Sequence, residues 1–175
     1  MVRRIAALAA VLFAVSMVPV FGAGSSPNLA SNHHNQTVLD FDVMAGVVEP
    51  FTGTANPIRG VPGGGLPWEI DEAKGELSSS GKLEVEVDGL VLARRAPVPA
   101  ELQGTNPVPS FKAIVSCLTV SNGTAATVNV ETDLAPATSS GDAKIEDFVA
   151  LPSPCIAPIV FVTSPTGAWF AATGS

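Results

Sequence analysis

The chain has 175 residues, with 16 acidic and 9 basic side chains and a formal net charge of −7. This balance argues against nucleic acid and anionic membrane surfaces as partners, because both attract clusters of Lys and Arg. The length suits one hydrophobic core of ordinary size.

The first 24 residues have the three parts of a secretory signal peptide. Arg3-Arg4 precedes an apolar run over 5–21, and small residues follow at 22–26. We expect residues 1–24 to be removed during export, which would leave seven basic residues against 16 acidic ones and a charge of −9. The alternative is an uncleaved anchor, since the apolar run comes close to spanning a bilayer.

Residues 25–37 are polar and aperiodic and predict a flexible linker. Both histidines of the chain, His33 and His34, lie in it. Neighbouring residues of an extended chain point apart, so the pair would supply at most half of a metal site. We therefore expect no metal here.

The ordered domain is expected to span residues 38–175. Apolar and acidic residues alternate over 38–43, which is the period of a half-buried strand. Residues 49–67 are rich in Gly and Pro and predict a long loop that crosses between sheets. Its triple glycine, 63–65, lacks the strand-to-helix context of a phosphate-binding loop.

Two strands, 68–77 and 82–92, are predicted to form a hairpin around Ser79-Ser80-Gly81. This loop would pair Leu77 with Leu83 on the inner face. Trp68 falls out of phase with the later inner residues, so a bulge is expected near Asp71-Glu72.

Glu84, Glu86 and Asp88 then line the outer face of this hairpin, with Lys74 opposite Glu86. Alternate residues of a strand stand about 6.8 Å apart, whereas calcium needs its oxygens at about 2.3–2.6 Å from several directions. We expect a solvated face that discourages aggregation, with a weak cation site as the alternative.

Residues 111–120 and 125–132 are predicted to form the central hairpin. Asn122-Gly123 favours a two-residue type I′ turn, because both of its central residues need positive φ. The turn places Cys117 opposite Val128 on the inner face. A disulfide to Cys155, the only other cysteine, would tie this hairpin to a later strand and stabilise the fold by roughly 4 kcal/mol.

The outer face of the same hairpin carries Ile114, Leu118 and Val120. Three apolar side chains on one face need cover. A loop of the same chain could provide it, and a partner protein is the other possibility.

Residues 143–151 fit either a strand with a defect or a short helical turn, and we predict a strand. A last hairpin is expected from 156–163 and 168–172, with Pro158 marking an edge strand or a bulge. Seven or eight short strands in three hairpins predict an all-β fold, an antiparallel β-sandwich or a partly open barrel with one disulfide.

Catalytic residues are scarce in this chain. It contains no tyrosine, its histidines lie in the predicted linker, and its cysteines are expected to be oxidised. A Ser-His-Asp or Cys-His arrangement would therefore lack a positioned base. A Ser–Lys pair stays formally open at the lysines of the mature chain, Lys74, Lys82, Lys112 and Lys144.

Several short segments together resemble a group of small exported bacterial β-rich proteins with one disulfide and no known activity. The segments are Gly75-Glu76-Leu77, 81–92, 106–109, 115–118 and Pro154-Cys155-Ile156-Ala157-Pro158. The resemblance covers most of residues 60–172 and implies a fold, not a catalytic role. The 68–92 hairpin alone is also similar to repeats of chordin-like CHRD domains, but the histidine-containing segment of those domains is absent here.

The sequence thus predicts a secreted, non-catalytic binding or cell-envelope interaction module without a cofactor. Its expected partner is a protein or a glycan, not nucleic acid, and no stable membrane insertion is expected once the signal peptide is removed. The alternative is a small secreted hydrolase or carbohydrate-binding domain.

Overall fold

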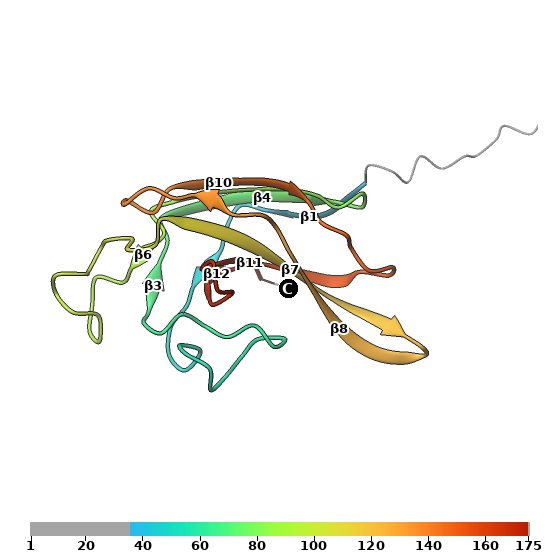
Figure 1. Cartoon of the computed structure of the whole chain (residues 1–175), viewed down its shortest axis with the longest axis horizontal. Coiled ribbons are helices and arrows are strands. Elements are labelled where there is room, and N and C mark those ends of the chain that lie inside the picture. The colour runs from blue at the N-terminus through green and yellow to red at the C-terminus, as the bar shows by residue number, and fades with distance from the viewer. Residues whose placement is uncertain (1–35, 175) are drawn as a thin grey trace, which may run out of the picture. The chain divides into compact units, whose positions relative to one another are not determined.

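The computed structural model describes residues 36–174, which form strands and turns and contain no helix (Figure 1). The all-β prediction is confirmed. The predicted signal peptide, His33 and His34 lie outside the described residues, as does the predicted linker up to residue 35.

Eight strands within this range have four or more residues, in line with the seven or eight expected. They are β1 (Thr37–Phe41), β4 (Glu72–Ser78), β5 (Lys82–Asp88), β7 (Ser110–Ser121), β8 (Thr124–Glu131), β10 (Ala143–Phe148), β11 (Ile156–Thr163) and β12 (Trp169–Ala172). Four more have two residues each: β2 (Ala45–Gly46), β3 (Trp68–Glu69), β6 (Val91–Leu92) and β9 (Ala135–Pro136).

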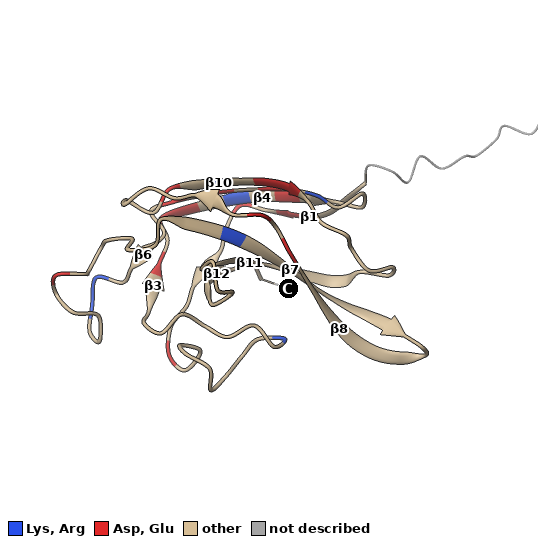
Figure 2. Cartoon of the chain, viewed as in Figure 1, with Lys and Arg blue, Asp and Glu red and all other residues tan. Residues whose placement is uncertain are grey.

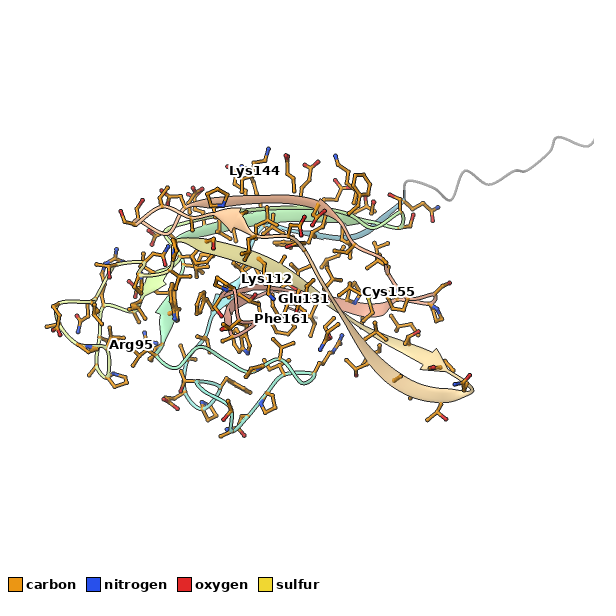
Figure 3. All side chains as sticks on the ribbon, viewed as in Figure 1. Arg95, Lys112, Glu131, Lys144, Cys155 and Phe161 are labelled. Atoms are coloured by element: carbon orange, nitrogen blue, oxygen red, sulfur yellow. A yellow bond between two sulfur atoms is a disulfide. The ribbon has the colours of Figure 1, made fainter. Side chains whose placement is uncertain are left out.

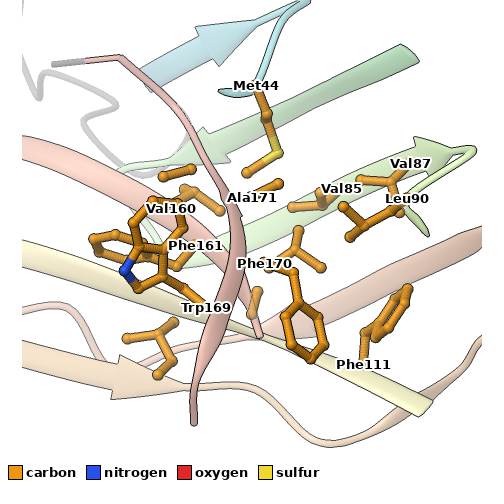
Figure 4. Close-up of a cluster of buried hydrophobic side chains, with 14 of the residues drawn as sticks. Met44, Val85, Val87, Leu90, Phe111, Val160, Phe161, Trp169, Phe170 and Ala171 are labelled. Atoms are coloured by element: carbon orange, nitrogen blue, oxygen red, sulfur yellow. The ribbon is translucent and has the colours of Figure 1, made fainter. Parts of the chain in front are cut away.

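Two antiparallel sheets form the layers of a sandwich (Figure 1). The four-stranded sheet has the order β1-β4-β5-β10, and the six-stranded sheet has the order β2-β12-β11-β7-β8, with β9 on β7. Neither sheet closes on itself. Their facing sides share one core, in which Val85 and Val87 of the first sheet lie near Phe111 and Phe170 of the second (Figure 4).

The β4–β5 hairpin has the predicted register, with Leu77 opposite Leu83. The prediction of two continuous strands with a bulge near Asp71-Glu72 is wrong. Both strands break, and β3 pairs with β6 in a separate two-stranded sheet. The reason is Gly89, which has a φ of 66° and leaves room for the Asp71 carboxylate where a Cβ would stand. This left-handed turn ends β5 before β6 begins.

The central hairpin also matches its prediction. Cys117 lies opposite Val128, and the turn residues Asn122 and Gly123 have φ angles of 51° and 77°. The predicted disulfide joins Cys117 to Cys155.

Residues 143–148 form the strand β10, which confirms the choice of a strand over a helical turn. Pro158 lies in β11, an interior strand between β12 and β7, so the bulge is the correct alternative. The pairing of β11 with β7 shifts between Ile156 and Ile159, and Ala157 in the shift has a φ of 45°.

The loop over 49–67 crosses from β2 to β3, as expected, and is held against β12. Trp169 donates its backbone N–H to Pro62 O at 2.8 Å and accepts one from Gly64 at 2.8 Å, and Gly63 donates to Gly53. The amides of Gly63 and Gly64 are therefore used within the chain. The side chains of Trp169 and Phe170 are both buried, with Phe170 stacked on Trp68 at 3.8 Å between ring centroids.

Candidate functional site

An apolar surface lies on the outer side of the six-stranded sheet, near the tip of the β7–β8 hairpin. Leu118 is 39% exposed, Val120 is 53% exposed, and Ile156 at the start of β11 is 50% exposed. Ile156 pairs directly with Leu118, so the two side chains share a face. We call Leu118, Val120 and Ile156 the apolar patch.

Ile114 does not belong to this patch. It is 4% exposed, which corrects its assignment to a possible partner surface. Its strand partner on β11 is the fully buried Phe161, and its Cδ1 lies 3.9 Å from where a Cβ on Gly167 would stand. The β11–β12 turn lies against Ile114, so the chain itself covers this residue, while Leu118 and Val120 stay exposed.

Arg59 anchors the loop over 49–67 on the outer face of the six-stranded sheet, and this anchor marks where the covered part of the face ends. Its Nη1 donates to Ser116 O at 3.0 Å and to Ala157 O at 2.7 Å. These carbonyls flank the bulge in β11, where Pro158 has no N–H to donate. Asn129 of β8 donates to Arg59 O at 3.0 Å. The loop is therefore anchored over Ser116 and Asn129, and the sheet beyond them is left open.

The disulfide positions the remaining member of the patch. Cys117 is fully buried, and its bond to Cys155 holds the start of β11 beside β7. Sequence reasoning did not include Ile156 in the apolar patch, although its position directly after Cys155 places it beside Leu118 once the disulfide is assumed. Arg59 gives no comparable signal, because its partners are backbone carbonyls far along the chain.

The outer side of the four-stranded sheet is acidic (Figure 2). Strand pairing aligns four carboxylates across its four strands, Asp40, Glu76, Glu84 and Glu146. We call these four residues the carboxylate row. Neighbouring strands are about 4.8 Å apart, so the like charges lie near one another.

Three lysines offset part of this charge. Lys74 pairs with Glu86 at 3.0 Å, as predicted, and Lys82 pairs with Glu84. The Lys82–Glu84 hydrogen bond lowers the pKa of Glu84 and raises the pKa of Lys82. Lys144, which points away from the core in Figure 3, pairs with Glu146 at 2.7 Å.

The possible weak cation site at Glu84, Glu86 and Asp88 gains no support from this arrangement. Glu84 and Glu86 are engaged by lysines. Between residues 36 and 174, no group of three or more His, Cys, Asp or Glu side chains is arranged to hold a metal ion. The row is a solvated charged face.

A groove of about 330 Å³ lies at one end of this face. Five carboxylates line it, together with Lys74 and four apolar side chains, and no aromatic residue does. The carboxylates are those of Asp42, Asp71, Glu72, Glu86 and Asp88. The adjoining hollow of the same volume, which shares Asp42, Lys74 and Glu86, is lined by the half-buried Phe41. Stacking against a sugar ring would need an aromatic side chain, and both tryptophans of the chain are buried.

The formally open Ser–Lys arrangement can be checked at each lysine. All four lysines of the described segment form ion pairs with glutamates, and the fourth pair is Lys112 with Glu131 (Figure 3). A Glu146 hydrogen bond raises the pKa of Lys144, as Glu84 does for Lys82. Such pairing favours the protonated ammonium, which cannot act as a general base.

The described part of the chain contains no helix that is long and apolar enough to cross a membrane. A disulfide between two strands is typical of proteins in oxidising compartments. Comparisons of the chain with protein-family models, with curated proteins and with solved structures find no match.

Proposed function

We propose that this protein is an exported, non-catalytic interaction module that binds a protein partner through the apolar patch. The observation that carries the proposal is the exposure of Leu118, Val120 and Ile156 beside one another on a disulfide-linked pair of strands. Rigid apolar side chains on a surface bind at little cost in conformational entropy.

The surroundings of the patch support the same proposal. The residues directly opposite it on β8 are Ala125 and Thr127, which are exposed and uncharged. Charged residues are depleted at the centre of protein interfaces, and this part of the sheet has that character. An acidic face on the other sheet keeps the remainder of the molecule soluble.

The proposed location is extracellular or in the cell envelope. The signal-peptide pattern of residues 1–24 and the Cys117–Cys155 disulfide support export. Nucleic acid and anionic lipid are poor partners for a chain of net charge −7.

A small hydrolase or carbohydrate-binding domain is the alternative, and it would use the acidic groove. The lining of that groove contains no exposed aromatic ring on which a sugar could stack. We therefore place the binding surface on the central hairpin.

Capture of partners from the native extracellular fraction tests the proposal. The bait is the purified protein, compared with a Leu118→Asp/Val120→Asp double variant. The matched control is Phe148→Asp, which replaces a 69% exposed apolar side chain on the other sheet. We expect the wild type and the control to retain the same partner. The double variant should bind that partner at least about tenfold more weakly, a loss of about 1.4 kcal/mol in binding free energy. Equal retention by all three would contradict the proposal.

A further inference from the structure

We infer that the free edge of β8 pairs antiparallel with β8 of a second copy of this chain. The inference goes beyond the proposed function and does not depend on it. Strand pairing would use the backbone of β8, whereas the proposed function uses the side chains of the apolar patch.

The register of the hairpin shows which backbone groups of β8 are free. Ser121 and Thr124 close a two-residue turn, and such a pair exchanges both of its hydrogen bonds. Alternate pairs along the strand do the same, so Ala126 and Val128 direct their N–H and C=O groups to β7. The corresponding groups of Ala125, Thr127 and Asn129 then point outward, and nothing among residues 36–174 hydrogen-bonds to them.

This edge also lacks the features that protect strand edges. Natural sheets guard their edges with charged residues, prolines, bulges or very short strands. No charged residue and no proline occurs from Ser121 to Val130, and Figure 2 shows the tip of the hairpin without charge.

The other edges of the two sheets are guarded. β1 carries Asp40 and a register shift near Thr37, and β10 carries Lys144 and Glu146. β2 has only two residues. β8 differs from these edges because it is long and carries no charge before its last residue, Glu131.

A second copy fits this edge because β8 is complementary to itself. An antiparallel pair centred on Thr127 sets Thr127 against Thr127 of the second copy, and Ala125 against Asn129. The core-side pair is then Ala126 with Val128, and Glu131 faces Gly123. No like charges are opposed, and a Thr–Thr pair across strands is favourable. This symmetric contact is the form expected of a two-fold dimer.

The charge of the molecule favours the same edge. With a net charge of −7, most contacts between two copies would bring carboxylates together. Half of the described acidic residues lie on the strands of the four-stranded sheet, while the β8 edge from Ser121 to Val130 has none (Figure 2). Two copies can meet there without that repulsion.

Sedimentation of the chain, in the form in which it is isolated from cells, tests the inference. We expect the wild type to be a dimer and Thr127→Pro to raise the dissociation constant at least about tenfold. Proline at this position removes only an outward N–H, which edge strands tolerate. Thr127→Val keeps the N–H and is the matched control, expected to remain dimeric.

Thr127→Lys provides a second variant in case the proline disturbs the fold. It places two positive charges opposite each other at the centre of the pair and should also give a monomer. A wild type that stays monomeric at about 1 mM overturns the inference and leaves the edge to an extended segment of another protein. A Thr127→Lys variant that folds and dimerises like the wild type overturns it too.

Cross-linking tests the register. Directly opposed residues of a hydrogen-bonded pair have Cα atoms about 5.5 Å apart, within the range a disulfide can bridge. Thr127→Cys should therefore form a disulfide-linked dimer in air. Ala125→Cys should not, since its counterpart would lie about 13 Å away along the strand. The reverse pattern would overturn the pairing.

Discussion

Arg59 links a loop to the sheet beneath it through two backbone carbonyls. Because Pro158 cannot donate at the bulge, the guanidinium supplies hydrogen bonds to the part-buried Ser116 O and to the exposed Ala157 O. The residue acts through hydrogen bonds to the backbone, so its contribution depends on geometry as well as on charge.

We expect Arg59→Met to lower the free energy of unfolding by about 1 kcal/mol, because it removes the hydrogen bonds to these two carbonyls. Arg95→Met is the control, since the Arg95 side chain is exposed and makes no hydrogen bond or ion pair within residues 36–174. Urea unfolding measures both variants. Equal midpoints for the two would show that the contact contributes nothing.

Asp142 has a pH-dependent role. Its carboxylate accepts the Gly89 N–H at 3.0 Å and the hydroxyl hydrogens of Ser140 and Thr138, which lowers its pKa below 3.8. A lowered pKa stabilises the fold above the unfolded value and loses that contribution as pH falls through the folded value.

The unfolding free energies of wild type and Asp142→Asn should therefore differ most above pH 3.8 and converge below it. We expect a difference of about 1–2 kcal/mol near neutral pH, measured by urea unfolding across the pH range. Glu101→Gln, whose carboxylate makes no hydrogen bond within the described range, serves as the control. A difference that does not vary with pH would contradict this assignment.

Among the elements, the central hairpin is the one whose geometry depends most on residues close to one another in the sequence. Its register follows from two turn residues, and the structure has the predicted pairing from the turn back to Ile114, beyond which β7 pairs with β9. Gly123 has a φ of 77°, a conformation that costs other L-residues about 1–2 kcal/mol.

Gly123→Ala should lower the free energy of unfolding by about 1 kcal/mol for this reason. Gly65→Ala is a matched control, because Gly65 does not have positive φ and has open space where a Cβ would stand. The two variants are compared by thermal unfolding. If both unfold at the same temperature, the turn geometry does not limit stability.

Elements set by local chemistry could be predicted from the sequence, and elements set by tertiary contacts could not. Alternation and turn residues predicted the β4–β5 and β7–β8 hairpins. The separate β3–β6 sheet depends on how Gly89 and Asp71 meet, and the burial of Ile114 depends on a turn more than 50 residues away. The sequence could not assign a role to Arg59, because its hydrogen-bond acceptors are backbone carbonyls, which every residue has.

For the whole molecule, the disulfide is the main covalent constraint. Cys117 and Cys155 are separated by 38 residues and join the hairpin to β11. Closing a loop of this length reduces the entropy of the unfolded chain by an amount worth about 4 kcal/mol.

Replacing both cysteines by alanine should therefore cost about 4 kcal/mol of stability. Reduced wild type should unfold at nearly the same urea concentration as the double variant, and the intact mass without reductant should show the bond in the native protein. Two free thiols in the exported form would contradict the assignment.

The positions of the charged and short strand edges also determine how many copies of this chain strand pairing can join. Among residues 36–174, a symmetric pair through β8 would use the one long edge without a charge at its centre, and no equivalent edge of these residues would be left on the outside of the dimer. Growth by strand addition therefore ends at two copies. A sheet paired in this way would offer no second edge of the described residues from which a fibre could grow.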